Sequence, residues 1–558
     1  MPGLSPLGRA RLYWETLRHL RLRQITGRIV HRLPRPRPST AEAPPLRRMT
    51  AVWAAPARRQ ASMTGPTEFT FLNERHDLDT VGWDDPALEK LWRYNLHYFE
   101  DLAAEDAAAR GEWHRDLIER WIAENPPGTG TGWEPYPTSL RIVNWIKWAL
   151  AGNDLSPNAL KSLAIQTRWL SRRLEYHILG NHLFANAKAL LFAGLFFDGE
   201  EAKGWTDTAL GILAREIPEQ ILTDGGQFER STMYHSLALE DMLDLVNLAA
   251  AFPDSAAVSA FAAAWRTRIP AMFVWLAAMS HPDGEIAFFN DAATGIAPSP
   301  DELRAYAIRL GIEIPHQPVE GVTHLAESGY VRVERDGIVA ILDVAPVGPD
   351  YLPGHAHADT LSFELSVGAR RVLVNSGTSV YGLGPERARQ RGTAAHNTVV
   401  VDGEDSSEVW AGFRVARRAR PFDLDISAEG SPAVVCSHDG YRRLPGRPVH
   451  RRQWRFGDDW LEIEDTLSAP GHSAQARYHV HPQLDLRLDE DGRSGTISDG
   501  MRPVVRFEAM AGRARVEDST YHPSFGVTLA NRCLVVELED CRARLRLSVA
   551  PDAGTLAV

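Results

Sequence analysis

Residues 329–344 read Gly-Tyr-Val-Arg-Val-Glu-Arg-Asp-Gly-Ile-Val-Ala-Ile-Leu-Asp-Val, and the character of the chain changes here. Apolar residues alternate with polar ones or run together over short lengths, with Gly and Asp between them. This pattern is typical of short antiparallel strands separated by turns. Similar segments follow at 371–374, 397–401, 460–464 and 542–549. We therefore expect an antiparallel β-sandwich over residues 326–558.

The chain before this stretch is helical in character, and we assign residues 85–325 to a helical domain. Ala, Leu and Trp recur there at helical spacing, and short Gly, Pro and Asp breaks separate the segments. The expected helices are 104–122, 138–151, 157–175, 182–197, 206–221, 234–252 and 256–279. Helices followed by strands predict an α+β protein of two juxtaposed domains. The groove between them is a natural place for a long ligand.

Composition is that of a globular protein with more than one domain. The chain has 558 residues, of which 44% are hydrophobic and 24% charged, and its formal net charge is −11. A cleft for a polyanion must be locally basic against this balance, and the arginines of 387–391 and 414–420 make that feasible. No nucleic-acid partner is expected. The three cysteines match no zinc or disulfide spacing, which predicts free thiols in a reducing compartment.

Residues 1–84 form a separate N-terminal segment. Within 1–33, Leu and Ile alternate with arginines in the pattern of a basic amphipathic helix, and a Pro-rich connection follows from Pro34. No apolar run is long enough for a signal peptide or a membrane span. We therefore expect a cytoplasmic protein whose basic helix packs on the body and also offers a contact to an anionic membrane surface.

The sharpest local motif is Gly354-His-Ala-His-Ala-Asp359, just before the strand-like run 360–365. Residues two apart on a strand face the same side, so His355 and His357 could enter one site. His396 opens a further strand-like run. Three histidines near strand ends could bind zinc, or one could shuttle a proton while two hold a metal. The alternative is that they only form hydrogen bonds within loops.

The helical half offers two polar breaks. Asn181 and His182 precede an apolar helix, where ordinary helix capping is an equally good interpretation. Tyr234 begins another helix, and a tyrosine in that position is more often part of the core. The preceding Gly-Gly turn, with its polar residues, makes a solvent-facing site plausible instead.

These motifs occur in one order: Asn181-His182, Asp224-Gly with Ser231 and Tyr234-His235, then Gly354-His-x-His357-x-Asp359 and His396-Asn-Thr-Val. Together they resemble the bacterial heparinase II/III polysaccharide lyases. Segments beginning at Trp92 and Trp133 resemble members without an export signal, often associated with exopolysaccharide gene clusters. The resemblance covers roughly residues 85–550. It implies an incomplete (α/α) toroid followed by an antiparallel β-sandwich.

The resemblance also implies a reaction, β-elimination in a uronate-containing glycan. It makes Tyr234 the general base or acid and His355 the second proton-transfer group. Asn181 and His182 are then expected to neutralise the carboxylate, as oxyanion-type donors do.

The resemblance further implies that His357 and His396 help to hold a structural zinc ion. Asn375 stands where the third ligand, an Asp, is expected, and a neutral amide is a poor zinc ligand. Three outcomes stay open: zinc is bound, Asp359 replaces the missing ligand, or the site is metal-free with Asn375 bonded to an imidazole.

Substrate contacts are expected from polar side chains near Tyr234, from one arginine of the basic stretch and from aromatic rings that could stack on sugars. These candidates are Gln227, Glu229, Arg230, Arg391, Trp133, Tyr136 and Trp410.

Two other functions fit the sequence less well. A glycoside hydrolase on the same toroid would need paired carboxylates, such as Asp224 with Glu229 or Asp283 with Glu285. A non-catalytic component of exopolysaccharide assembly would need no chemistry at all, because a fold alone does not establish activity.

Overall fold

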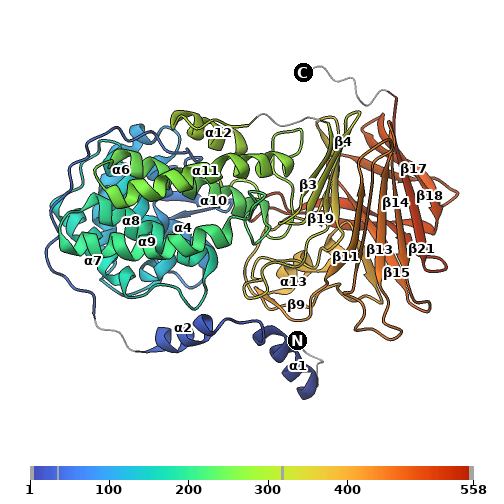
Figure 1. The fold of residues 1–558 in the computed structure, drawn as a ribbon, viewed down its shortest axis with the longest axis horizontal. Coiled ribbons are helices and arrows are strands. Elements are labelled where there is room, and N and C mark those ends of the chain that lie inside the picture. The colour runs from blue at the N-terminus through green and yellow to red at the C-terminus, as the bar shows by residue number, and fades with distance from the viewer. Residues whose placement is uncertain (1–4, 34–36, 316–319, 552–558) are drawn as a thin grey trace.

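The computed structural model describes residues 5–33, 37–315 and 320–551, and it contains a helical body and a body of sheets side by side (Figure 1). In the helical body, the last helix ends at Arg309, and the first strand of the sheets begins at Gly321. A helical toroid followed by antiparallel sheets confirms the predicted fold class.

The helical body is built around α8, which is apolar on all faces, and its neighbours α6 and α9 cover it. A Cβ at Gly194 would lie 2.3 Å from Thr206 Oγ1, so α8 and α9 can pack closely only because this position is glycine. The helices are α3 (Leu78–Val81), α4 (Lys90–Tyr98), α5 (Gly111–Glu124), α6 (Pro135–Leu150), α7 (Pro157–Ser171), α8 (Gly180–Phe196), α9 (Glu200–Gln220), α10 (Thr232–Ala251), α11 (Ala256–Ala278) and α12 (Pro300–Arg309). A hairpin of β1 (Glu68–Phe71) and β2 (Glu74–Asp77) precedes them.

Two antiparallel sheets form the second body, and their facing apolar side chains make its core. One sheet has the order β11-β12-β13-β14-β21-β18-β17-β16 and the other β19-β20-β15-β7-β6-β5-β4-β3, with β8 pairing to β15. The strands are β3 (Gly321–Leu325), β4 (Tyr330–Arg335), β5 (Ile338–Asp343), β6 (Phe363–Val367), β7 (Arg370–Leu373), β8 (Val399–Val401), β11 (Pro421–Ser427), β12 (Ala433–His438), β13 (His450–Phe456), β14 (Trp460–Leu467), β15 (Ala474–Val480), β16 (Asp485–Leu488), β17 (Ser494–Asp499), β18 (Arg502–Ala511), β19 (Arg513–Tyr521), β20 (Leu529–Glu537) and β21 (Arg542–Val549).

The connections between strands carry the polar motifs. The expected strand over 360–365 begins only at Phe363, because the chain turns at Leu361, whose φ is 63°. His355 and His357 therefore lie in the β5–β6 loop rather than on a strand. The helix α13 (Pro385–Arg391) and the short pair β9 (Val409–Trp410) and β10 (Arg414–Val415) lie in later connections. Cys436, Cys533 and Cys541 are free thiols.

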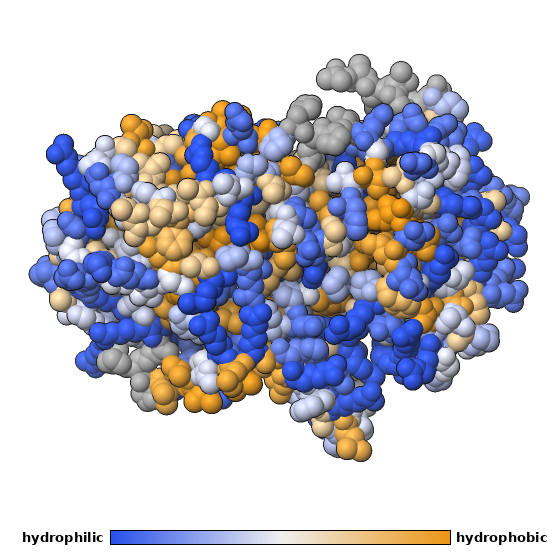
Figure 2. Space-filling model, in the orientation of Figure 1, coloured by the Kyte–Doolittle hydropathy of each residue, from blue (hydrophilic) through white to orange (hydrophobic). Residues whose placement is uncertain are grey.

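Residues 5–33 form two helices, α1 (Pro6–Leu17) and α2 (Leu22–Arg32), instead of the single helix expected. We call them the N-terminal arm; they lie along one side of both bodies (Figure 1). Apolar residues gather along this lower edge (Figure 2). Exposed apolar side chains of the arm include Leu7, Trp14, Leu17, Leu22, Ile29, Val30 and Leu33.

Two expectations about the N-terminal region need a qualification. Pro34 and Pro36 of the expected Pro-rich connection lie outside the described residues. In the described part of the chain, no helix is long and apolar enough to cross a membrane.

Candidate active site

Tyr234 lies in the first turn of α10, where the Ser231 side chain caps the helix by accepting a hydrogen bond from the Tyr234 amide at 3.2 Å. Its ring packs against the His355 ring with 3.9 Å between centroids, and its hydroxyl lies 3.1 Å from that of Tyr381. The structure thus brings the two predicted proton-transfer groups into direct contact, one from each body.

Asp291 is the centre of a buried polar network. Its two oxygens lie 2.9 Å from His355 Nδ1 and 2.9 Å from His357 Nε2, and both accept hydrogen bonds from the Arg387 guanidinium. Burial alone would raise the pKa of Asp291, but Arg387 and the two histidines outweigh it and hold that pKa well below its ordinary value. Asp291 is therefore an ionised carboxylate.

Sequence reasoning missed Asp291 altogether. The available signal was a polar pair, Asn290-Asp291, inside the otherwise apolar run 286–293. Asn290 is also functional in the network, because its side-chain oxygen accepts a hydrogen bond from the His357 amide. Buried polar pairs of this kind have a structural or chemical partner elsewhere in the chain.

The bond to Asp291 fixes the state of His355. Since a carboxylate only accepts hydrogen bonds, His355 Nδ1 carries a proton, and in the neutral ring the lone pair is therefore on Nε2. The ring is held from behind by Asp291 and covered on one face by Tyr234. This arrangement prepares His355 to accept a proton at Nε2.

Asn181 and His182 occupy the first turn of α8. Asn181 lines the same pocket as Tyr234, and the His182 ring lies 4.5 Å from the Tyr136 ring that also lines it. His182 Nδ1 is 3.1 Å from a Glu175 carboxylate oxygen. Burial lowers the pKa of His182, but Glu175 outweighs it and the pKa is raised. His182 thus tends to carry a positive charge beside the pocket.

The pocket is a cavity of about 170 Å³ between the inner faces of α6, α8 and α10. Tyr136, Asn181 and Tyr234 line it near the starts of these helices. Lys188 and Asp241 follow seven residues after Asn181 and Tyr234, about two turns deeper, and pair with each other at 2.6 Å. The pocket is therefore polar near Lys188 and Asp241 as well as near Tyr234 and Asn181.

The structure places some of the expected substrate contacts at the pocket and others away from it. Gln227 and Tyr136 line the pocket. Glu229 is buried beside His355, with 3.9 Å between Glu229 Oε2 and His355 Nε2, and burial raises its pKa. The Arg230 guanidinium donates instead to the Ser328 carbonyl at 2.9 Å, away from the residues that line the pocket.

Three expected sugar contacts are wrong. Trp133 is 3% exposed in the helical core, where its ring nitrogen donates to the Asn125 carbonyl. Arg391 is fully buried and donates to the carbonyls of Ala356 and Gly412. Trp410 is covered by the N-terminal arm. Each side chain is of a sugar-binding type, but tertiary packing leaves it no surface for a ligand.

The proposed metal ligands do not complete a zinc site. His357 Nδ1 and His396 Nε2 lie 3.3 Å apart, a spacing that two ligands of one zinc ion also show. Asn375 accepts a hydrogen bond from the Asn397 amide, and Asp359 accepts one from the Asn290 amide. Across the residues that the structure describes, no group of three or more His, Cys, Asp or Glu could hold a metal ion. Zinc stays a prediction.

The hydrogen bonds of His357 and His396 indicate a role other than metal binding. If His396 Nε2–H donates to His357 Nδ1, then His357 Nε2–H donates to Asp291, and both ring nitrogens of His357 are satisfied. Burial lowers the pKa of both histidines, which keeps them neutral. They support Asp291, and through it His355.

The carboxylate pairs considered for a hydrolase are engaged elsewhere. Asp224 accepts hydrogen bonds from the Ser328 amide and hydroxyl. Asp283 forms an ion pair with Arg371, and with Glu285 it lines a different cavity of about 670 Å³. Of these four carboxylates Glu229 lies near Tyr234, beside His355, but its expected partner Asp224 is engaged with Ser328, which weakens the hydrolase alternative.

A helical toroid joined to a β-sandwich, with a tyrosine, a histidine and an asparagine at their junction, defines the class of the polysaccharide lyases. Two solved structures of heparinase III share the fold, with TM-scores of 0.65 and 0.61 at 18% sequence identity. The matches cover 85% and 83% of this chain and 80% of each of those chains.

The family follows from the sequence comparison. The model of the heparinase II/III N-terminus matches residues 63–303, and that of the heparinase II/III-like C-terminal domain matches residues 317–548. The chain therefore belongs to the heparinase II/III family, and the predicted resemblance and enzyme class are confirmed.

Two relatives are named heparin-sulfate lyase. The chain is 27% identical to the one from Bacteroides stercoris over 497 residues, which is 78% of this chain and 69% of that protein. It is 26% identical to the one from Pedobacter heparinus over 327 residues, which is 51% of this chain and 47% of that protein.

Proposed function

We propose that the protein cleaves a uronate-containing glycan by β-elimination. The observation that carries this proposal is the contact between Tyr234 and His355 at the pocket, with Asp291 fixing the His355 ring from behind. Such a pair can remove one proton and supply another on the same side of a sugar.

The substrate carboxylate must be neutralised before the C5 proton can leave, because the intermediate adds negative charge beside it. Asn181 lines the pocket and offers amide hydrogens, and His182 beside it offers positive charge supported by Glu175. Both sit at the N-terminus of α8, where the helix dipole also favours an anion. Removing one such donor costs about 10²–10³ in rate in comparable sites.

The pKa of Tyr234 assigns the two proton transfers. Burial, together with the neighbouring Tyr381, raises this pKa well above its ordinary value, so the phenol is protonated at neutral pH. His355 Nε2 then takes the C5 proton, and the electron pair forms the C4–C5 double bond as the C4–oxygen bond breaks. Tyr234 gives its proton to the leaving oxygen. The products are an unsaturated uronyl end and a new hydroxyl end.

An anionic polysaccharide is the substrate class. The names of the two relatives support it, as does the pair formed by Asn181 and His182. We favour a polymer that the cell itself makes, or its lipid-linked precursor, over an external glycosaminoglycan. The motif segments at Trp92 and Trp133, similar to members from exopolysaccharide clusters, motivate this preference.

A panel of uronate polymers tests the function. Elimination creates a double bond conjugated with the carboxylate, which absorbs in the near ultraviolet. We expect this absorbance to rise with the native protein and to be lost with Tyr234→Phe. Cleavage without the absorbance would favour the hydrolase, and binding without cleavage would favour the non-catalytic assembly component.

We also propose that the N-terminal arm contacts an anionic membrane surface. Residues 1–33 carry seven arginines against one glutamate, on a protein of net charge −11. Exposed apolar side chains accompany them, among which Leu22 is 74% and Trp14 66% exposed. Apolar and basic groups on one helical segment favour the interface of an anionic bilayer.

A further inference from the structure

The N-terminal arm lies on both bodies and precedes both family matches, the first of which begins at residue 63. Its first helix, α1, contacts the sheet body: Leu12 packs on Trp410, whose ring nitrogen donates to the Thr16 hydroxyl at 3.0 Å. Its second helix, α2, lies over two loops, one from each body.

Gln24 of α2 joins these two loops. Its side chain is 2% exposed, and its amide nitrogen donates to the carbonyl of Ile178 at 3.3 Å and to that of Tyr351 at 3.1 Å. Ile178 precedes Asn181 by three residues, and Tyr351 precedes His355 by four. One buried amide thus bridges the loop that carries the carboxylate-binding pair and the loop that carries the base.

Two further contacts keep α2 in this place. The Arg21 guanidinium lies 3.6 Å over the Tyr351 ring and forms an ion pair with Glu219, which accepts a hydrogen bond from the Tyr351 hydroxyl. Gly27 packs directly on the toroid loop, because a Cβ there would lie 2.8 Å from the His177 backbone nitrogen.

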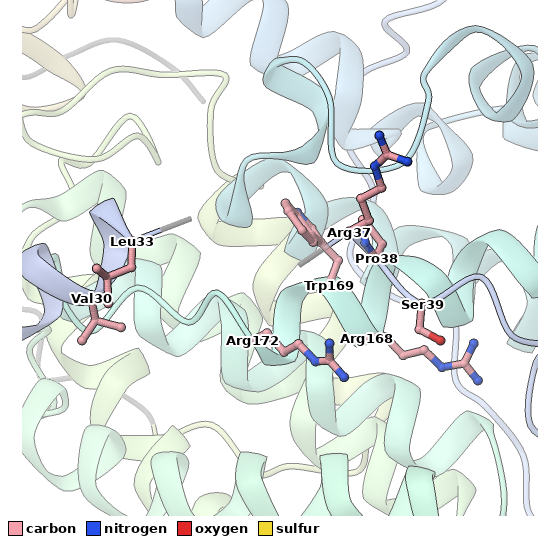
Figure 3. Close-up of a pocket in the computed structure, with 8 residues that line it drawn as sticks. All are labelled: Val30, Leu33, Arg37, Pro38, Ser39, Arg168, Trp169 and Arg172. Carbon is pink, nitrogen blue, oxygen red and sulfur yellow. The ribbon is translucent and has the colours of Figure 1, made fainter. Parts of the chain in front are cut away.

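Farther along α2, the His31 ring stacks on the His177 ring of the toroid loop with 4.1 Å between centroids. Between the end of α2 and α7 lies a cavity of about 210 Å³, bordered by Val30 and Leu33 on one side and by Trp169 and Arg172 on the other (Figure 3). The contacts around Gln24 are therefore the ones that join α2 to both loops.

We propose that Gln24 is a positioning residue for the reaction. Through Ile178 and Tyr351 it fixes the spacing between the two loops, so that Asn181 and His355 face one pocket across the junction of the two bodies. The effect on rate rests on the proposed function, whereas the effect on the loops does not. Displacing a catalytic group by about 1 Å can cost about 10²-fold in rate.

Gln24→Glu is the sharpest perturbation. The glutamate has the same shape, and it can still accept the Arg21 amide hydrogen bond that caps α2 at 3.0 Å. It cannot donate to the two loop carbonyls, and it places a charge against them. Thr26→Ala is the matched control, because the exposed Thr26 hydroxyl bonds only within α2.

Hydrogen exchange of the full-length chain provides the first readout. We expect amides of 175–182 and 348–357 to exchange about tenfold faster or more in Gln24→Glu than in the native protein or Thr26→Ala. Peptides of the central strands should be unchanged. Unaltered exchange in both loops, or faster exchange confined to the arm, would overturn the proposal.

Gly27→Ala is an independent test. Alanine favours a helix more than glycine does, so α2 itself becomes more stable. The new methyl group, however, collides with the His177 backbone. We expect faster hydrogen exchange in the same two loops.

Activity provides the last readout. On a substrate that the native protein cleaves, Gln24→Glu and Gly27→Ala should each lower kcat by about 10-fold or more, with a smaller change in KM. Loosened loops with unchanged kcat would refute positioning, whereas no cleavage even by the native protein would refute only the proposed function.

Discussion

Asp291→Asn should separate catalysis from stability at the centre of the network. The Asp291 carboxylate and the Arg387 guanidinium are both fully buried and pair through two hydrogen bonds. Removing the carboxylate charge leaves the guanidinium buried without its partner, which costs about 3–5 kcal/mol of unfolding free energy. The amide also cannot hold His355 in its tautomer, and losing such an orienting carboxylate costs about 10⁴ in rate in a comparable triad.

A second change tells these two effects apart. In Asp291→Asn with Arg387→Met, the unpaired charge is gone, so much of the lost stability should return. His355 still lacks its carboxylate, so turnover should stay low. Urea unfolding and the initial rate of ultraviolet-absorbing product measure the two quantities on the same samples. An Asp291→Asn protein within tenfold of the native rate, or a double variant that regains turnover, would show that Asp291 does not orient His355 for the reaction.

Tyr234, His182, the zinc site and the N-terminal arm can each be tested separately. Tyr234→Phe should lower turnover by about 10²–10⁴-fold while glycan binding and melting temperature persist, since only a proton donor is lost. Glu175 raises the pKa of His182 and outweighs the opposite effect of burial. The rate should therefore fall as the pH rises through this pKa, because His182 loses its positive charge. In a pH–rate profile, Glu175→Gln should move this fall to lower pH. Because no group of three or more His, Cys, Asp or Glu among the described residues could hold a metal ion, metal analysis should find less than one zinc per chain, and a chelator should leave melting unchanged; stoichiometric zinc would contradict this. The full-length protein should sediment with vesicles of anionic lipid but not of neutral lipid, and less so at high salt. Replacing the exposed Trp14 and Leu22 of the arm by Ser should abolish this sedimentation.

Helical spacing and short strand-like runs predicted both bodies because these patterns are local. The segment 157–175, for example, became α7 at Pro157–Ser171, and 542–549 became β21. The ordered motifs also placed Tyr234 with His355. For the helices and strands, neighbouring residues contain the information, whereas the pairing of Tyr234 with His355 came from the family resemblance of the ordered motifs.

Features that depend on distant contacts were not predictable. Asp291 meets His355 across 64 residues and Arg387 across 96, so nothing near it in the sequence identifies its partners. Trp133 and Arg391 have side chains suited to sugars, and only the tertiary fold shows that both are buried. The arm's periodicity predicted helix, but not that Gln24 would face two catalytic loops.

Cleavage in heavy-oxygen water distinguishes β-elimination from hydrolysis. β-Elimination breaks the C4–oxygen bond without adding water, so the new reducing ends should carry no more label than a control oligosaccharide, whose hemiacetal oxygen exchanges slowly with water. The fragment with the unsaturated end should be one water lighter than a hydrolysis product. Mass spectrometry of a cleaved uronate polymer measures both properties at once. Unsaturated fragments with no label above that control are the predicted result; saturated fragments labelled beyond the control at their newly formed reducing ends would show hydrolysis and contradict the proposed elimination.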